Sequence, residues 1–213
     1  AFSKIPAESD YYMPAGFRML QIRVNALLDK APTMKRADAQ QLARNLVSEL
    51  AAYMRRSREF AAKTANAAQK KDALSWGAEC GLLIAALYKD IIGAPAEALQ
   101  WAQRVEKEWS AVAGIQRRCE VMIIRIGLEV EKVLPRLKKL LAEDPAGTEQ
   151  LLAMAVRQLY DRIERLRFSL DPKDQAKARE LQQTEKLFAE ELYRTATEQN
   201  LPASQMATFQ SAL

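Results

Sequence analysis

The sequence predicts an all-α protein, an antiparallel bundle of about four helices followed by a C-terminal helical extension. Apolar residues recur about every 3.6 residues along nearly the whole chain. No segment of five or more residues alternates cleanly between apolar and polar side chains with β-branched enrichment, so no strand is needed. Only 7 of the 213 residues are glycine and 8 are proline, and the helix breakers leave helix-length segments between them.

The first two helices are predicted on either side of the turn at Ala31-Pro32-Thr33. The first is expected over residues 17–30, which carry an apolar stripe at helical spacing. Thr33 is expected to cap a longer second helix, because its hydroxyl can accept from backbone amides of a first turn. The core-facing stripe of that helix consists of Leu42, Leu46, Leu50, Tyr53 and Phe60.

A third helix is predicted after the polar residues 69–72, and it is expected to lie at the centre of the core. Gly77 and Gly81 fall on one line at a spacing of four. Because glycine inside a helix costs about 1 kcal/mol relative to alanine, two on one line indicate that another element approaches closely there.

Gly93 is expected to end the third helix and Pro95 to begin a fourth. The fourth helix carries an apolar stripe made by Trp101, Val105, Trp109 and Val112. Core packing is the expected role of the tryptophans, with a ligand pocket inside the bundle as the alternative. Short connections at 30–33 and 93–95 favour antiparallel neighbours.

The remainder of the chain is also predicted to be helical. The apolar run 121–126 is interpreted as a helix continuing toward Leu134, with a buried strand as the alternative. A later helix has a narrow apolar seam, expected to contact other helices, and Asp171-Pro172 begins a final helix to about Glu198. The seam consists of Leu152, Val156, Leu159, Ile163, Leu166 and Leu170. We therefore expect a basic four-helix bundle over 1–114 and a helical extension or second bundle over 115–213.

Composition argues against common catalytic chemistries. Without histidine the chain cannot form Ser-His-Asp or Cys-His catalytic sets or His-bearing metal sites. It also lacks a glycine-rich phosphate loop, and carboxylate pairs such as Glu190-Glu191 are expected to be solvated. We expect no cofactor, no metal and no enzymatic activity. Cys80 and Cys119 are expected to be buried thiols of a cytoplasmic protein, or of a particle assembled inside the cell, and no membrane insertion is expected.

The charge distribution is the main functional signal. The net charge is +5, but residues 35–71 hold nine basic and three acidic residues, a local +6. The candidate face for phosphate or nucleic acid consists of Arg44, Arg55, Arg56, Arg58, Lys63, Lys70 and Lys71. The two aromatic residues of this stretch, Tyr53 and Phe60, belong to the predicted core stripe. No aromatic residue is therefore left on the basic face to supply base stacking, and a solvated face or an acidic protein partner is the favoured alternative.

Two functions follow from these observations. The leading hypothesis is a non-enzymatic interaction or assembly protein that contacts copies of itself or other subunits of a larger complex through its helices. The alternative is a nucleic-acid-binding accessory protein that uses the basic helix face, centred on Arg44, Arg55 and Arg58, on an oligomeric bundle.

Overall fold

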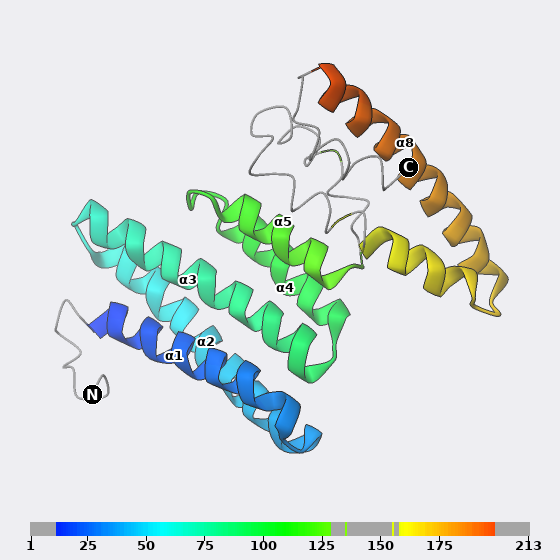
Figure 1. The fold of residues 1–213 in the computed structure, drawn as a ribbon. Coiled ribbons are helices and arrows are strands. Elements are labelled where there is room, and N and C mark those ends of the chain that lie inside the picture. The colour runs from blue at the N-terminus through cyan, green and yellow to red at the C-terminus, as the bar shows by residue number, and fades with distance from the viewer. Residues whose placement is uncertain (1–11, 129–134, 136–154, 156–157, 199–213) are drawn as a thin grey trace. The chain divides into compact units, whose positions relative to one another are not determined.

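The computed structural model describes residues 12–128, 135, 155 and 158–198, and its regular elements there are all helical (Figure 1). The prediction of an all-α fold is confirmed. The chain divides into two compact units, Ala1–Met122 and Ile123–Leu213. This division falls inside a helix, and the expected domain boundary after residue 114 stays a prediction. The two units are described separately below.

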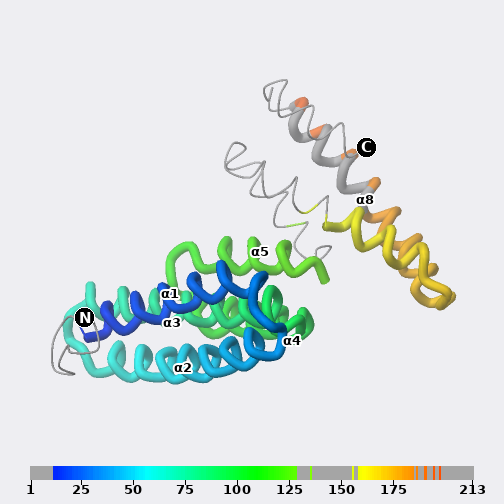
Figure 2. The backbone as a smooth tube through the Cα atoms, turned by 60° about the horizontal axis from the view of Figure 1, so that its bottom comes forward, coloured from blue at the N-terminus to red at the C-terminus, as the bar shows by residue number. Residues whose placement is uncertain are grey.

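The first unit is built around a central helix. Its helices are α1 (Tyr12–Lys30), α2 (Arg36–Lys63), α3 (Ala67–Leu87), α4 (Pro95–Glu108) and the start of α5 (Ile115–Ile126). Helix α3 packs against α1, α2 and α4, as Figures 1 and 2 show from two sides. Its residues Ile84 and Leu87 are fully buried. An ion pair between Glu79 and Arg118 joins α3 to α5.

The two glycines of α3 make close packing possible. A Cβ atom on Gly77 would lie 2.7 Å from Cζ3 of Trp109 and 2.8 Å from Oγ of Ser57. A Cβ atom on Gly81 would overlap Val105 and lie 3.1 Å from Cε of Met54. The predicted close approach is therefore confirmed, and its partners lie on α2 and at the end of α4.

Helices α1 and α2 are joined by an aromatic contact and a buried hydrogen bond. The Tyr53 hydroxyl donates to the carbonyl oxygen of Met13 at 2.7 Å. The ring centroid of Phe17 lies 6.3 Å from that of Tyr53 and 6.4 Å from that of Trp76. Leu42, which we expected in the core stripe of α2, is 46% exposed, since it lies on the edge of the buried stripe.

Three helix starts differ from the predictions. Helix α1 begins at Tyr12, because Pro14 is tolerated in the first turn, where no intrahelical donor is needed. Thr33 does not cap α2: it lies in a short 3₁₀ turn, and its hydroxyl donates to the carbonyl oxygen of Lys30 at 2.9 Å. Helix α3 begins at Ala67, because Asn66 Oδ1 accepts from the backbone amides of Ala68 and Gln69.

Glycines end two of the helices. A π-helical turn (Tyr88–Ile92) follows α3, and Gly93, with φ of 76°, ends it before Pro95 begins α4, as predicted. The run 121–126 is helical, which confirms the preferred interpretation. The expected continuation toward Leu134 is wrong at Gly127, whose φ of 76° ends α5. Helix α4 ends at Glu108, so Val112 lies in the following turn.

Both cysteines are free and fully buried, as expected for thiols that act as small apolar side chains. Burial raises the pKa of the Cys80 thiol to about 12. Within the described residues, no helix is long and apolar enough to cross a membrane.

The second unit contains a helix at 158–167, a tight turn and α8 (Pro172–Glu198). Asp171 Oδ1 accepts from the backbone amide of Lys173 at 2.8 Å, and the Ser169 hydroxyl donates to Asp174 at 2.6 Å. The predicted helix start at Asp171-Pro172 is therefore confirmed. Four buried side chains lie on the two helices that flank this turn: Leu159, Ile163, Ala178 and Leu181.

Candidate functional site

The seven basic residues proposed as one face are all exposed, but they do not lie together. Arg56 and Arg58 are two residues apart and so point about 160° apart around α2. The Arg56 guanidinium donates to the Tyr12 hydroxyl at 3.5 Å and lies 5.9 Å from the Tyr53 ring centroid, on the α1 side. Arg58 contacts Glu108 and Trp109, on the α4 side.

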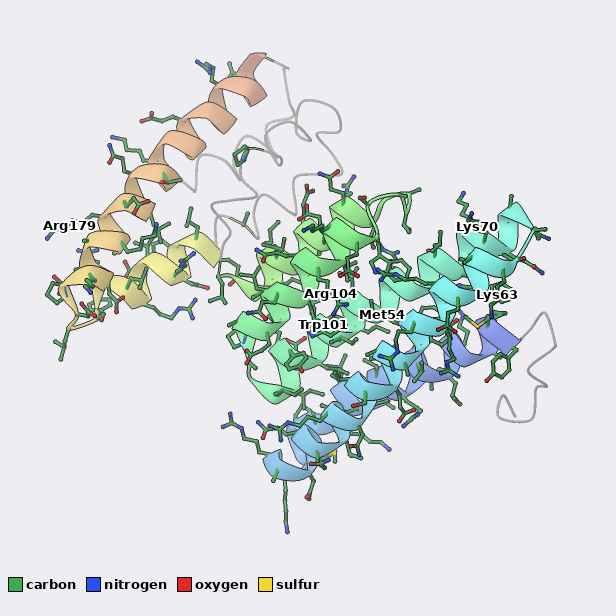
Figure 3. All side chains as sticks on the ribbon, turned by 180° about the vertical axis from the view of Figure 1, so that it is seen from behind. Met54, Lys63, Lys70, Trp101, Arg104 and Arg179 are labelled. Carbon is green, nitrogen blue, oxygen red and sulfur yellow. The ribbon has the colours of Figure 1, made fainter. Side chains whose placement is uncertain are left out.

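The remaining basic residues are distributed along the first unit. Arg44 lies nearer the start of α2, on the same stripe as Arg55. Lys63 and Lys70 flank the α2–α3 connection, far from Trp101 and Arg104 in the view of Figure 3, and Lys71 follows in α3. Of the seven predicted residues, Arg55 and Arg58 are therefore the two that lie next to α4.

A cleft of about 110 Å³ lies between α2 and α4 where Arg55 and Arg58 meet the fourth helix. Its walls are two helical stripes that face each other, and Figure 3 shows Met54, Trp101 and Arg104 gathered there. The lining residues are Ala51, Met54, Arg55 and Arg58 of α2 and Trp101, Arg104 and Glu108 of α4. Three guanidinium groups and one carboxylate thus surround a small hollow with an aromatic wall.

Glu108 organises two of the three arginines. Arg58 Nη2 donates to Glu108 Oε2 at 2.6 Å, and Arg104 Nε donates to Glu108 Oε1 at 2.7 Å. The hydrogen bond from Arg58, followed by the charge and hydrogen bond of Arg104, holds the pKa of Glu108 below its usual value. The carboxylate is ionised at neutral pH and neutralises one of the two bound guanidinium groups.

Each of these arginines also lies over a tryptophan ring. The Arg58 guanidinium carbon is 4.4 Å from the Trp109 ring centroid, and that of Arg104 is 5.1 Å from the Trp101 ring centroid. Cation–π contacts of this kind contribute about 0.5–1 kcal/mol at exposed sites and fix the guanidinium planes. The arrangement can attract anions by charge and planar groups by stacking, and the residues that line it include no candidate nucleophile or proton-transfer pair.

The tryptophans serve two roles: Trp76 and Trp109 pack against other side chains, and Trp101 lines the cleft. Trp109 is a core residue, 3% exposed, and its Nε1 has no hydrogen-bond partner among the described residues. Trp76 packs on Phe17. Trp101 is half-buried and lines the cleft.

Sequence reasoning did not identify Arg104 and Glu108 as site residues. Their signal is the spacing Trp101, Arg104, Glu108, which places all three on one face of α4. The spacing indicates a site only once α2 is known to lie opposite this face of α4. The tertiary structure also brings an aromatic ring, Trp101, to Arg55 and Arg58, since Tyr53 and Phe60 of the same helix were assigned to the core stripe.

The predicted interaction seam lies partly outside the described residues, which do not include Leu152 and Val156. Leu159 is fully buried and Ile163 is 4% exposed. Leu166 is half-buried, and Leu170 is 97% exposed in the turn before α8. Phe168, in the same turn, is 78% exposed, so the two most exposed large apolar side chains among the described residues lie at this turn.

Comparison of the chain with known protein families, with curated proteins and with solved structures gives no match.

Proposed function

We propose that this chain is a non-enzymatic, all-helical interaction protein that acts as a subunit of a larger complex through helix–helix contacts. The observation that carries the proposal is the apolar turn of the second unit, where Phe168 is 78% and Leu170 is 97% exposed. Full burial of one such side chain contributes about 1.5–3 kcal/mol. The two side chains together supply a substantial driving force for docking onto a copy of the chain or another subunit.

The turn is suited to this role because it is held in place from within. The Ser169 hydroxyl donates to Asp174, and Asp171 accepts from the Lys173 amide, so the turn is tied to the start of α8 while Phe168 and Leu170 stay exposed. The partner would therefore meet a preformed surface, which lowers the entropy lost on binding.

The test is a double substitution, Phe168→Ser with Leu170→Ser, studied by light scattering over a concentration series and by cross-linking in cells. We expect assembly to weaken, whereas Ile22→Ser, which removes a 57% exposed apolar side chain from the first unit, should leave it unchanged. A wild-type chain that stays monomeric at about 100 μM and forms no cross-link from this turn to another protein would contradict the proposal.

We place the complex in the cytoplasm, or in a particle assembled inside the cell. The two free, buried cysteines support this location, because reducing compartments keep thiols unpaired.

A second candidate function is binding of nucleic acid by the first unit as an accessory protein. It is favoured by Arg44 and Arg55, which are exposed and make no ion pair among the described residues. The expected result is binding that weakens steeply between about 50 and 200 mM salt. Binding that persists unchanged over this range, or that survives reversal of Arg44, Arg55 and Arg58 to Glu, would overturn it.

A further inference from the structure

We infer that the cleft between α2 and α4 is a binding site for single-stranded nucleic acid, in which a base stacks against Trp101 and Arg104 while Arg55 contacts the phosphate backbone. This inference rests on the second candidate function and specifies its site, its substrate class and its internal competitor. Four features support it: the size of the cleft, its charge, its aromatic wall, and the cationic row that Arg44, Arg55 and Arg58 form along α2.

The cleft is too small to enclose a free cofactor. Its volume of about 110 Å³ lies below the roughly 300–1,000 Å³ of small-molecule sites. A hollow of this size takes one ring or one charged group of a longer molecule, whose remainder runs over the surface. The ligand is therefore a chain that is bound at intervals along its length.

The charge around the cleft selects an anionic chain. Arg55, Arg58 and Arg104 contribute three positive charges and Glu108 one negative charge, which leaves a local excess of two. Arg44 extends the cationic row along α2 to a length of about 20 Å from Arg58, at about 1.5 Å per residue. A row of this length suits several consecutive phosphates better than one isolated carboxylate.

The aromatic wall distinguishes a single strand from a duplex. Trp101 lines the cleft, and the Arg104 guanidinium lies 5.1 Å from its ring centroid, so an unpaired base can stack on this guanidinium or take its place on the ring. Bases in a duplex are covered by their neighbours and cannot enter, whereas the bases of a single strand stack on such surfaces in any sequence. We therefore expect a preference for single strands with little preference for sequence.

Glu108 acts as the internal competitor of the incoming phosphate. Its carboxylate already holds Arg58 and Arg104. A phosphate that enters the cleft therefore competes with Glu108 for these two guanidinium groups, whereas Arg55 has no ion pair among the described residues. Removing this carboxylate charge should therefore strengthen binding. If Glu108 only stabilised the fold, Glu108→Gln would weaken two ion pairs and would not strengthen binding.

The experiment measures binding of the full chain to a labelled oligothymidylate of about 20 nucleotides by fluorescence anisotropy, across about 50–200 mM salt. Trp101→Ala should weaken binding about fivefold or more, the effect of losing one stacked base. Arg55→Gln should weaken binding and lower the salt slope by about 0.7. Glu108→Gln should strengthen binding about two- to fivefold.

Arg56→Gln is the matched control. It removes the same charge from the adjacent position of α2, but Arg56 lies on the α1 side against Tyr12 and Tyr53. We expect a clearly smaller change in affinity from this variant than from Arg55→Gln. The pair also keeps the test decisive if Trp101→Ala fails to fold, because both arginines are exposed.

Each possible outcome supports or overturns the inference. Salt-dependent binding with equal effects of Arg55→Gln and Arg56→Gln overturns the cleft and leaves the nucleic-acid function standing. Absence of binding at about 50 mM salt overturns both. Tighter binding of a duplex of equal length, or equal binding of poly-glutamate with the same dependence on Arg55 and Glu108, overturns the single-strand assignment; the second result would make the cleft a site for acidic protein.

Discussion

The ring of Trp109 occupies the space that a side chain at Gly77 would need. A Cβ atom on Gly77 would lie 2.7 Å from Cζ3 of that ring, with Ser57 2.8 Å away on another side. Because Trp109 follows directly after Glu108 and lies under the Arg58 guanidinium, the same contact that closes the core also positions the cleft between α2 and α4.

Gly77→Ala should destabilise the chain by up to about 2 kcal/mol. Overpacking costs about 1–3 kcal/mol, and the better helix propensity of alanine offsets about 1 kcal/mol of this. Urea unfolding measures the loss. Gly16→Ala is the control, because its Cβ would come no closer than 3.3 Å to the Tyr53 ring and should cost less. Stabilisation by Gly77→Ala would mean that Trp109 does not pack there.

Tyr53→Phe should lower the free energy of unfolding by about 1 kcal/mol, because it removes the buried hydrogen bond to the carbonyl oxygen of Met13. The matched control is Tyr160→Phe, at a tyrosine that is 55% exposed, where we expect a change within about 0.5 kcal/mol. Thermal and urea unfolding of both variants check this, and equal effects would exclude a buried hydrogen bond at Tyr53.

Asn66→Ala should cost about 1 kcal/mol, since the Asn66 side chain accepts from two otherwise unpaired amides at the start of α3. Thr33→Ala should change stability by less than about 0.5 kcal/mol, because Thr33 caps no helix and donates to the Lys30 carbonyl in an exposed turn. A larger loss from Thr33→Ala than from Asn66→Ala would reverse the assignment of these two positions.

Stability should fall at alkaline pH, in part through Cys80. Burial raises the pKa of its thiol from 9.0 to about 12. Between these values the unfolded chain releases a proton that the folded chain retains, so the free energy of unfolding falls by about 1.4 kcal/mol per pH unit. The stabilising contribution is complete below pH 9 and is lost as the pH rises toward 12.

The check is to compare the pH dependence of unfolding for the wild type and Cys80→Ala under reducing conditions. The variant should lose about one proton from the slope between pH 9 and 11. Burial also raises the pKa of Tyr53 above 10.0, and this contribution should remain in both proteins. Identical slopes would show that Cys80 ionises in the folded chain.

Much of the fold could be predicted because local physics determines it. Gly93, Pro95 and Asp171 mark helix ends through backbone conformations and caps that need no tertiary partner. The errors arose where two local signals compete. Thr33 and Asn66 are both capable caps, and Gly127 interrupts an apolar pattern that otherwise continues.

The candidate site was predictable only in part. Arg55 and Arg58 are conspicuous in a basic stretch, but the same stretch contains Arg56, which the helix places on the other side of α2. Helical spacing separates Arg56 from Arg58, yet it does not reveal which neighbour each side meets.

Residue spacing and composition are enough to predict that the chain is helical, that Gly77 and Gly81 are close-packing positions, and that these 213 residues offer no histidine chemistry. The packing of the helices was needed to show that Trp101, Arg104 and Glu108 of α4 face Arg55 and Arg58 of α2. The physical reason is that helix periodicity is a property of neighbours along the chain. A binding cleft between helices depends instead on how their backbones pack in space, and here the missing side chains of two glycines let both α2 and α4 lie close against α3.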